Sequence, residues 1–209
     1  MKQAAIERIE RLRKLYLATP MFTDRLSFNR TRRQRLHFLR AFAQSGHLYS
    51  TRLRRSAADA YLFDNMAPVI HEDELIVGLP DVSPLTPEEQ AEYDTLCKGA
   101  QFAPQYARVT AAHMALDYAK LLRVGVRGLL DEVNCRAAGL DLNNPENIEK
   151  CEFYDGCRME LEALIRLQHR YADHARKMAK AAAEPRKSEL FEIARILDRV
   201  PEQPAATFR

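Results

Sequence analysis

Several residue types that define other protein classes are scarce in this sequence. Its 209 residues include 7 glycines, 4 cysteines and no tryptophan. The cysteines contain no Cys-x-x-Cys pair and are too few for a disulfide framework. Two of them, Cys151 and Cys157, are six residues apart on a predicted helix and therefore on different faces, which argues against a shared metal ion. We expect buried free thiols at Cys97, Cys135, Cys151 and Cys157.

Long apolar runs and a secretion signal are missing as well. Residues 1–8 contain no apolar signal core, and no stretch of about 18 uninterrupted apolar residues occurs in the sequence. These absences predict a soluble, cytoplasmic protein without a membrane partner.

Charge of one sign is not in large excess either. The chain has 32 Lys and Arg against 29 Asp and Glu, and a formal net charge of +3 implies no overall affinity for nucleic acid. The basic residues gather on two predicted amphipathic helices, without the alternating aromatic residues that stack on bases. We expect both clusters to be solvated or to form salt bridges with the rest of a larger protein: Arg30, Arg32, Arg33 and Arg35, and Arg52, Arg54 and Arg55.

The motifs of several catalytic classes are also absent. The sequence has no glycine-rich phosphate loop, no His-Glu-x-x-His zinc motif and no nucleophile elbow. The adjacent acids Glu72, Asp73 and Glu74 point in alternating directions in an extended segment and so rarely converge on one atom. The sequence therefore predicts no metal site.

What the sequence does contain is apolar residues at helical spacing, within a composition that is 46% hydrophobic. Pro20 should end a first helix, Asp24 should cap a second one that ends at Ser45-Gly46, and Thr86-Pro87-Glu88-Glu89 is typical of a capping box. Asn144-Pro145 should begin the longest helix. The pattern predicts a mainly α fold with further helices at 51–66, 113–130 and 187–198, and short strands or extended segments within 69–77. One face of the first helix is formed by Ile6, Ile9, Leu12 and Tyr16. The helix 51–66 should bury Leu53, Ala57 and Tyr61, with Leu62 as a further candidate.

The predicted helix 113–130 contains two glycines. Each should weaken a helix by about 1 kcal/mol relative to alanine. Gly125 and Gly128 are three residues apart and so share a face, where another backbone or a packed ring can come close.

The start of that helix reads His-x-x-x-Asp-Tyr-x-Lys-Leu-Leu from His113 to Leu122. This motif, together with others in the same order along the chain, resembles the N-terminal region of the pyruvate formate-lyase domain of glycyl radical enzymes, in the glycerol and diol dehydratase-like branch. The resemblance runs from near residue 10 to the last residue. The other matching segments are residues 54–57, 70–78, 153–154, 161–163, 170–172, 187–190 and 199–201.

The resemblance implies the N-terminal helical part of a ten-stranded α/β barrel, with residues 1–209 forming an incomplete domain and no separate second domain. It implies a lyase or dehydratase that cleaves a C–O, C–C, C–N or C–S bond by radical chemistry. A radical S-adenosylmethionine activase installs the glycyl radical in such an enzyme, so the implied partners are the activase, the remainder of the enzyme and a second copy in a homodimer.

Neither the radical glycine loop nor the thiyl cysteine loop of this family is present. Arg123-Val124-Gly125-Val126 and the segment around Cys157 are only faint look-alikes. We therefore expect no catalytic residue and no bound cofactor in this chain, which we interpret as a fragment that is inactive alone.

The resemblance points to one substrate-binding residue, His113, because the matching histidine of diol-dehydrating relatives lies beside the substrate hydroxyls. Asp117, four residues on, should share its helix face and orient the imidazole, or pair with Lys120 instead. The connection 79–112 is shorter than in those relatives, which leaves the substrate open. A stand-alone helical adaptor and a basic nucleic-acid-binding protein are the alternative interpretations.

Overall fold

A computed structural model describes residues 2–18, 31–48, 50–78, 81, 83–99 and 116–207. These residues form helices and connecting segments, which confirms the mainly α prediction, and none of them forms a strand. The segment 69–77 is irregular, with a turn at Glu72 and Asp73. None of the described helices is long and apolar enough to cross a membrane. The helices are α1 (Lys2–Ala18), α3 (Arg32–Gln44), α4 (Thr51–Asn65), α5 (Pro87–Gly99), α7 (Tyr118–Ala138), α8 (Ile148–Ala181) and α9 (Arg186–Leu197), with short 3-10 helices at Ser45–His47 and Pro145–Asn147.

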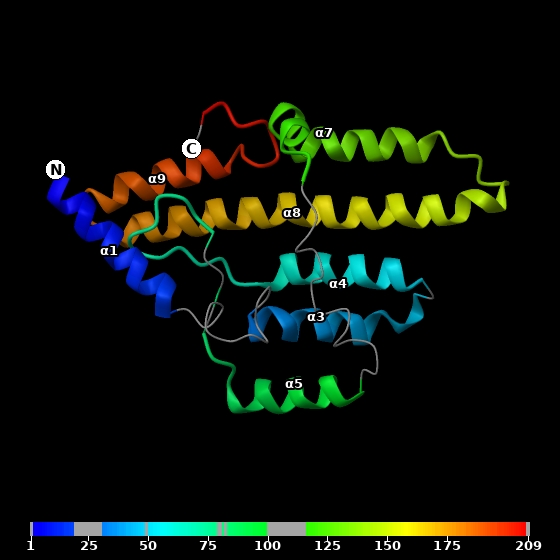
Figure 1. Cartoon of the computed structure of the whole chain (residues 1–209), viewed down its shortest axis with the longest axis horizontal. Helices are drawn as coiled ribbons and strands as arrows, with labels where there is room; N and C mark the ends of the chain where they lie inside the picture. The colour runs from blue at the N-terminus through cyan, green and yellow to red at the C-terminus, as the bar shows by residue number, and fades with distance from the viewer. Residues whose placement is uncertain are drawn as a thin grey trace.

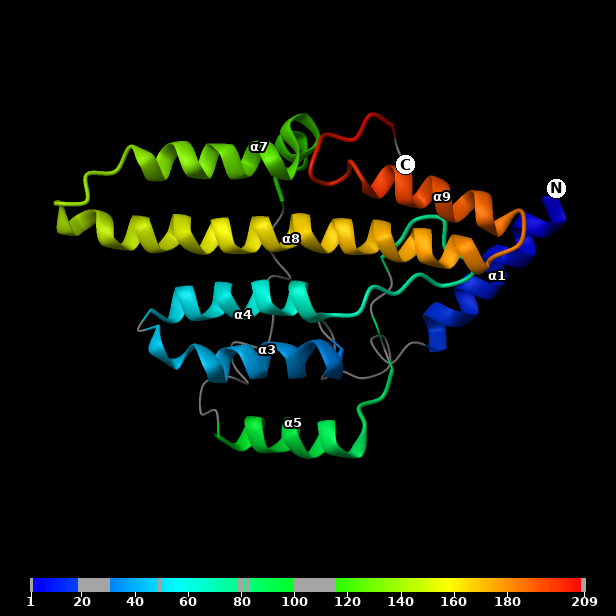
Figure 2. The same cartoon turned by 180° about the vertical axis from the view of Figure 1, so that it is seen from behind.

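The long helix α8 is the axis of the arrangement. Helix α4 packs along one side of it, and α7 and α9 pack along the other side, one after the other (Figures 1 and 2). Helix α3 packs on α4, and α5 packs on α3. The fold is therefore a row of nearly parallel helices, which α1 crosses at one end (Figure 1).

Small residues let the neighbouring helices approach α8 closely. Ala163, Ala172, Ala175 and Ala179 are fully buried along it. A Cβ atom at Gly156 would lie 2.7 Å from the Ser56 hydroxyl oxygen of α4. Because the distance between packed helices depends on the side chains at the contact, these residues allow α8 to contact three helices along its length.

The start of α3 and the buried face of α4 both differ from the prediction. Thr31 caps α3 in a capping box with Gln34, so no single helix runs from Asp24, which lies outside the described residues, to Ser45. On α4 the buried residues are Ser56, Ala58, Asp59 and Leu62, whereas Leu53, Ala57 and Tyr61 are only partly buried. The reason is that α4 lies between α3 and α8 and presents a face to each of them.

Helix α1 contacts the rest of the protein through ion pairs, and part of its apolar face is exposed. Ile6 and Ile9 are 54% and 61% exposed, so the described residues leave this part of the apolar face uncovered. Arg8 donates to both carboxylate oxygens of Glu189 at 2.6 and 2.8 Å, and Arg11 donates to both carboxylate oxygens of Asp73 at 2.8 and 2.7 Å. The helix thus docks through two bidentate ion pairs, a geometry that favours arginine.

These ion pairs predict that acid releases α1. The hydrogen bond from Arg11 lowers the pKa of Asp73, and the hydrogen bond from Arg8 lowers the pKa of Glu189. Carboxylates with a lowered pKa contribute stability that is present above their ordinary values of 3.8 and 4.5 and is lost as the pH falls through the folded values. In an NMR titration, the amide resonances of α1 should move together as both carboxyls protonate. If they keep their positions after both carboxyls have titrated, another contact holds the helix.

The basic clusters find partners within this chain. Arg33 donates to Glu89 at 2.7 Å and to the Pro84 carbonyl at 2.9 Å. The Arg54 guanidinium lies 4.1 Å from the centre of the Phe42 ring and donates to the Phe42 carbonyl. The expectation of partners elsewhere in a larger protein was therefore wrong for these two arginines, and their charge is already engaged by local groups.

The cysteines also depart from the prediction in part. All four are free thiols, as expected, but Cys135 is exposed and the other three are only partly buried. The prediction of four buried thiols was wrong because each cysteine lies on a helix face that borders solvent.

Candidate functional site

The first candidate residue, His113, lies outside the described residues, and the structure begins again at Leu116. Asp117 is described and is exposed at the start of α7. Its carboxylate accepts a hydrogen bond from the Lys120 backbone amide at 2.9 Å, so Asp117 is the N-cap of the helix. The prediction that Asp117 lies within a helix was wrong, because α7 begins only at Tyr118. The Lys120 ammonium pairs with Glu132 at 2.5 Å instead of with Asp117.

Helix α7 is broken at Gly125. This residue has φ 65° and ψ −179°, a backbone conformation that is essentially restricted to glycine. The helix therefore changes direction sharply beside the C-terminal tail (Figures 1 and 2). The expected continuous helix through both glycines was wrong, and the break divides α7 into an N-terminal arm, residues 116–124 with the cap included, and a longer second half.

A second segment of backbone occupies the space beside the break. We call residues 201–204 the strap. The Val126 amide donates to the Pro201 carbonyl and the Arg127 amide donates to the Glu202 carbonyl, both at 2.9 Å. A Cβ atom at Gly125 would lie 2.5 Å from the Glu202 carbonyl oxygen and 2.9 Å from the Pro204 nitrogen. The expectation that a backbone approaches Gly125 is confirmed.

Gly128 does not share this role. A Cβ atom there would meet the Val124 side chain at 2.6 Å, within the same helix. The expectation of a packed neighbour from elsewhere was therefore wrong for Gly128, because the break at Gly125 turns the arm toward it.

The strap is held by the side chain of Glu202. Its carboxylate accepts from the Arg127 guanidinium at 3.0 and 2.5 Å and contacts His169 Nε2 at 3.0 Å. The Glu202 backbone amide donates to the side-chain oxygen of the buried Gln168 at 2.6 Å. The hydrogen bond from Arg127 lowers the pKa of Glu202, and the hydrogen bond from His169 lowers it further. The carboxylate is thus kept ionised and joined to α7 and α8 at once.

Sequence reasoning did not identify these four residues. Glu202 lies in a proline-rich tail without periodicity, and Arg127 and His169 read as ordinary exposed positions on helices. The one signal that pointed there was the matching segment Arg199-Val200-Pro201, which directly precedes Glu202.

The arm ends in an exposed apolar surface. Leu116, Tyr118 and Leu122 are 64%, 63% and 61% exposed. Exposed apolar side chains that gather on one part of a surface often mark a site of contact with another surface. The N-terminal end of α7 is therefore suited to contact with another protein surface or with residues outside the described ranges.

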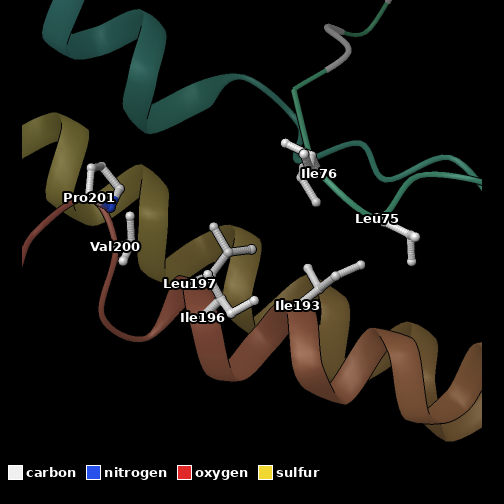
Figure 3. A pocket seen from close by; sticks show the side chains of 8 residues that line it. Leu75, Ile76, Ile193, Ile196, Leu197, Val200 and Pro201 are labelled. Carbon is white, nitrogen blue, oxygen red and sulfur yellow. The ribbon is translucent and has the colours of Figure 1, made fainter. Parts of the chain in front are cut away.

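A groove of about 240 Å³ lies between the 75–77 segment and α9. Figure 3 shows Leu75 and Ile76 on one side and Ile193, Leu197, Val200 and Pro201 on the other. Its lining side chains are all apolar, so they offer shape and no group that could transfer a proton or hold a charge. The strap residue Pro201 forms one end of this groove.

The two segments that faintly resemble the radical loops, around Gly125 and Cys157, both lie in helices and are packed against other parts of the chain. Gly125 packs against the strap, as described above. Cys157 lies within α8, where burial and then Glu160 raise the pKa of its thiol, which lowers the fraction of thiolate. Among the described residues, no group of three or more His, Cys, Asp or Glu is placed to hold a metal ion.

Known structures share this arrangement of helices. The B12-independent glycerol dehydratase of Clostridium butyricum matches 84% of this chain with a TM-score of 0.72 at 22% identity, over 29% of its own length. A glycyl radical enzyme from Archaeoglobus fulgidus matches 84% of the chain with a TM-score of 0.71 at 22% identity, over 30% of its own length. The fold is that of the N-terminal helical portion of these barrel enzymes, as predicted.

Curated relatives match a shorter stretch at higher identity. The chain is 42% identical over 94 residues to the isethionate sulfite-lyase of Oleidesulfovibrio alaskensis, which is 44% of this chain and 11% of that enzyme. It is 38% identical over 90 residues to the (2S)-3-sulfopropanediol dehydratase of Klebsiella oxytoca, which is 43% of this chain and 11% of that enzyme. The chain thus spans about a tenth of the length of these relatives. The family model described as pyruvate formate lyase-like matches residues 90–209, more than half of the sequence, and the chain belongs to this family.

Proposed function

We propose that this chain is the N-terminal helical portion of a glycyl radical lyase or dehydratase. The family match over residues 90–209 is the observation that carries the proposal. The curated relatives are a sulfite-lyase and a dehydratase, which favours an enzyme over a stand-alone adaptor. Residues 1–209 are then an incomplete domain without a second domain, in a cytoplasmic enzyme that cleaves a C–O, C–C, C–N or C–S bond of a small substrate.

In this proposal the described helices form part of the wall of the substrate pocket. The apolar surface of the arm, Leu116, Tyr118 and Leu122, supports that role because exposed apolar patches often mark contact sites. His113 is the substrate-binding residue, and its imidazole can donate or accept one hydrogen bond at a substrate hydroxyl. Asp117 caps the helix that follows, so it holds the end of the arm next to His113 instead of pairing with a substrate.

The remainder of the enzyme supplies the reaction. The glycyl radical, installed by a radical S-adenosylmethionine activase, provides the hydrogen abstraction that starts bond cleavage. The partners of this chain are accordingly the rest of the barrel, the activase and a second copy in a homodimer. We expect no nucleic-acid partner, because the net charge is only +3 and five of the seven arginines of the two basic clusters contact groups of this chain: Arg32, Arg33, Arg52, Arg54 and Arg55.

The proposal predicts how the chain behaves with an activase. Under strict anoxia, with a matching activase and S-adenosylmethionine, the 209-residue chain should give no glycine-centred doublet in electron paramagnetic resonance. The reason is that the family's radical loop does not occur in this sequence. The positive control is a complete relative, such as an isethionate sulfite-lyase, activated in the same way.

A doublet from the chain alone would contradict this assignment. Loss of the doublet in Gly125→Ala, or its persistence there, would then show whether Gly125 or another residue carries the radical. The assignment also fails if a protein that joins this chain to the rest of a family barrel folds, carries the radical and lacks any lyase or dehydratase activity.

A further inference from the structure

The strap completes the hydrogen bonding of the broken helix. In an uninterrupted α-helix the amides of Val126 and Arg127 would donate to the carbonyls four residues earlier. At the break they donate instead to the Pro201 and Glu202 carbonyls, at 2.9 Å each. Buried backbone amides are almost always paired, so the direction of the arm and the seating of the strap depend on each other.

Glu202 joins the strap to both α7 and α8. Its carboxylate contacts Arg127 on α7 and His169 on α8, and its amide donates to Gln168 on α8. Glu202 therefore connects the second half of α7 to α8. The side-chain and amide contacts of the other strap residues are local, since the Gln203 amide donates to the Arg199 carbonyl at 2.6 Å and Pro201 and Pro204 have no amide hydrogen.

We propose that Glu202 is a positioning residue that sets the direction of the arm, residues 116–124, and thereby the substrate-facing end of α7. Only the statement that this end of α7 faces substrate rests on the proposed function. The contact between the strap and the break is observed within the described residues. Loss of the Glu202 contacts should free the Val126 and Arg127 amides, and the arm should then join the second half of α7 or swing away from it.

The first test uses the 209-residue chain. Glu202→Ala should speed hydrogen exchange at the Val126 and Arg127 amides by at least about fivefold, because charged hydrogen bonds hold the strap. Glu202→Gln, which keeps an acceptor for Arg127, should fall between. The matched control is Glu192→Ala, which removes the acid of an exposed ion pair with Arg195 on α9 and should leave both amides unchanged.

The second test asks whether the arm moves. Spin labels at Leu122 and Lys177, in a background with serine at the four cysteine positions, report the distance between the arm and α8. Glu202→Ala should shift or broaden that distance distribution and Glu192→Ala should not. Faster exchange without a change in distance would overturn the proposal, because the strap would then be loosened without directing the arm. Unchanged exchange and an unchanged distance would overturn it as well.

The third test uses the complete enzyme. Glu202→Ala should raise KM for the substrate by about tenfold while the radical yield stays at the wild-type level, and Glu202→Gln should recover part of the loss. If the arm moves in the chain but the complete protein has no radical activity, the proposed function fails and the positioning role stands. If the complete enzyme is active and KM does not respond to Glu202→Ala, the positioning role is wrong and the proposed function stands.

Discussion

Gly125→Ala should lower the free energy of unfolding of this chain by about 3–5 kcal/mol. A side chain at φ 65° and ψ −179° costs about 1–3 kcal/mol, and a Cβ atom 2.5 Å from the Glu202 carbonyl oxygen must displace the strap. The two backbone hydrogen bonds of the strap, worth about 1 kcal/mol each, would be lost with it. Urea unfolding followed by circular dichroism measures the change.

The control for this experiment is Gly139→Ala at the other end of α7. Gly139 has φ −84°, and a Cβ atom there would lie 3.7 Å from the nearest neighbour, the Arg136 carbonyl oxygen. We expect less than about 1 kcal/mol of change from this substitution. If Gly125→Ala costs no more than Gly139→Ala, the helix accepts a continuous path and the break has no energetic basis.

In the complete enzyme, His113→Ala should lower turnover by about 5- to 150-fold and leave the radical yield intact. The loss of one or two hydrogen bonds to a substrate hydroxyl costs about 1–3 kcal/mol. His113→Gln keeps a donor and an acceptor and should recover part of the rate. The electron paramagnetic resonance signal and the cleavage rate are measured in the same activated sample.

His174 on α8 provides a control for the loss of an imidazole, because it is a partly buried histidine that is not among the proposed substrate-binding residues. His174→Ala should leave turnover close to wild type. A wild-type rate in His113→Ala at the wild-type radical yield would show that His113 has no part in substrate binding. A loss of the radical in His113→Ala would show instead that this part of the chain affects activation.

Two local signals of helix boundaries were reliable in this sequence. The Thr86 and Glu89 capping box is present, with both reciprocal hydrogen bonds at 2.9 and 3.2 Å. Asn144 and Pro145 begin a short 3-10 helix that leads directly into the longest helix at Ile148, close to the predicted start. These features depend on a few neighbouring residues, so the sequence contains the information that is needed to predict them.

The faces of the helices were harder to predict. Ile6 and Ile9 follow helical spacing, yet they are exposed because Arg8 and Arg11 dock α1 from another side. Apolar spacing shows that a helix has an apolar face, but it does not show what will cover that face. For the candidate site, the sequence indicated His113 and Asp117 by resemblance, and only the structure showed that Asp117 is a cap.

By itself the sequence determined the mainly α class, most helix boundaries and, through ordered motifs, the family. The tertiary structure alone decided the break in α7 and the role of Glu202. The positive φ of Gly125 is stable because the strap carbonyls replace the lost helical acceptors, and Arg127 and Glu202 are 75 positions apart in the chain. Hydrogen bonding over such a separation depends on the packing of α7, α8 and the tail together, and no local pattern encodes it.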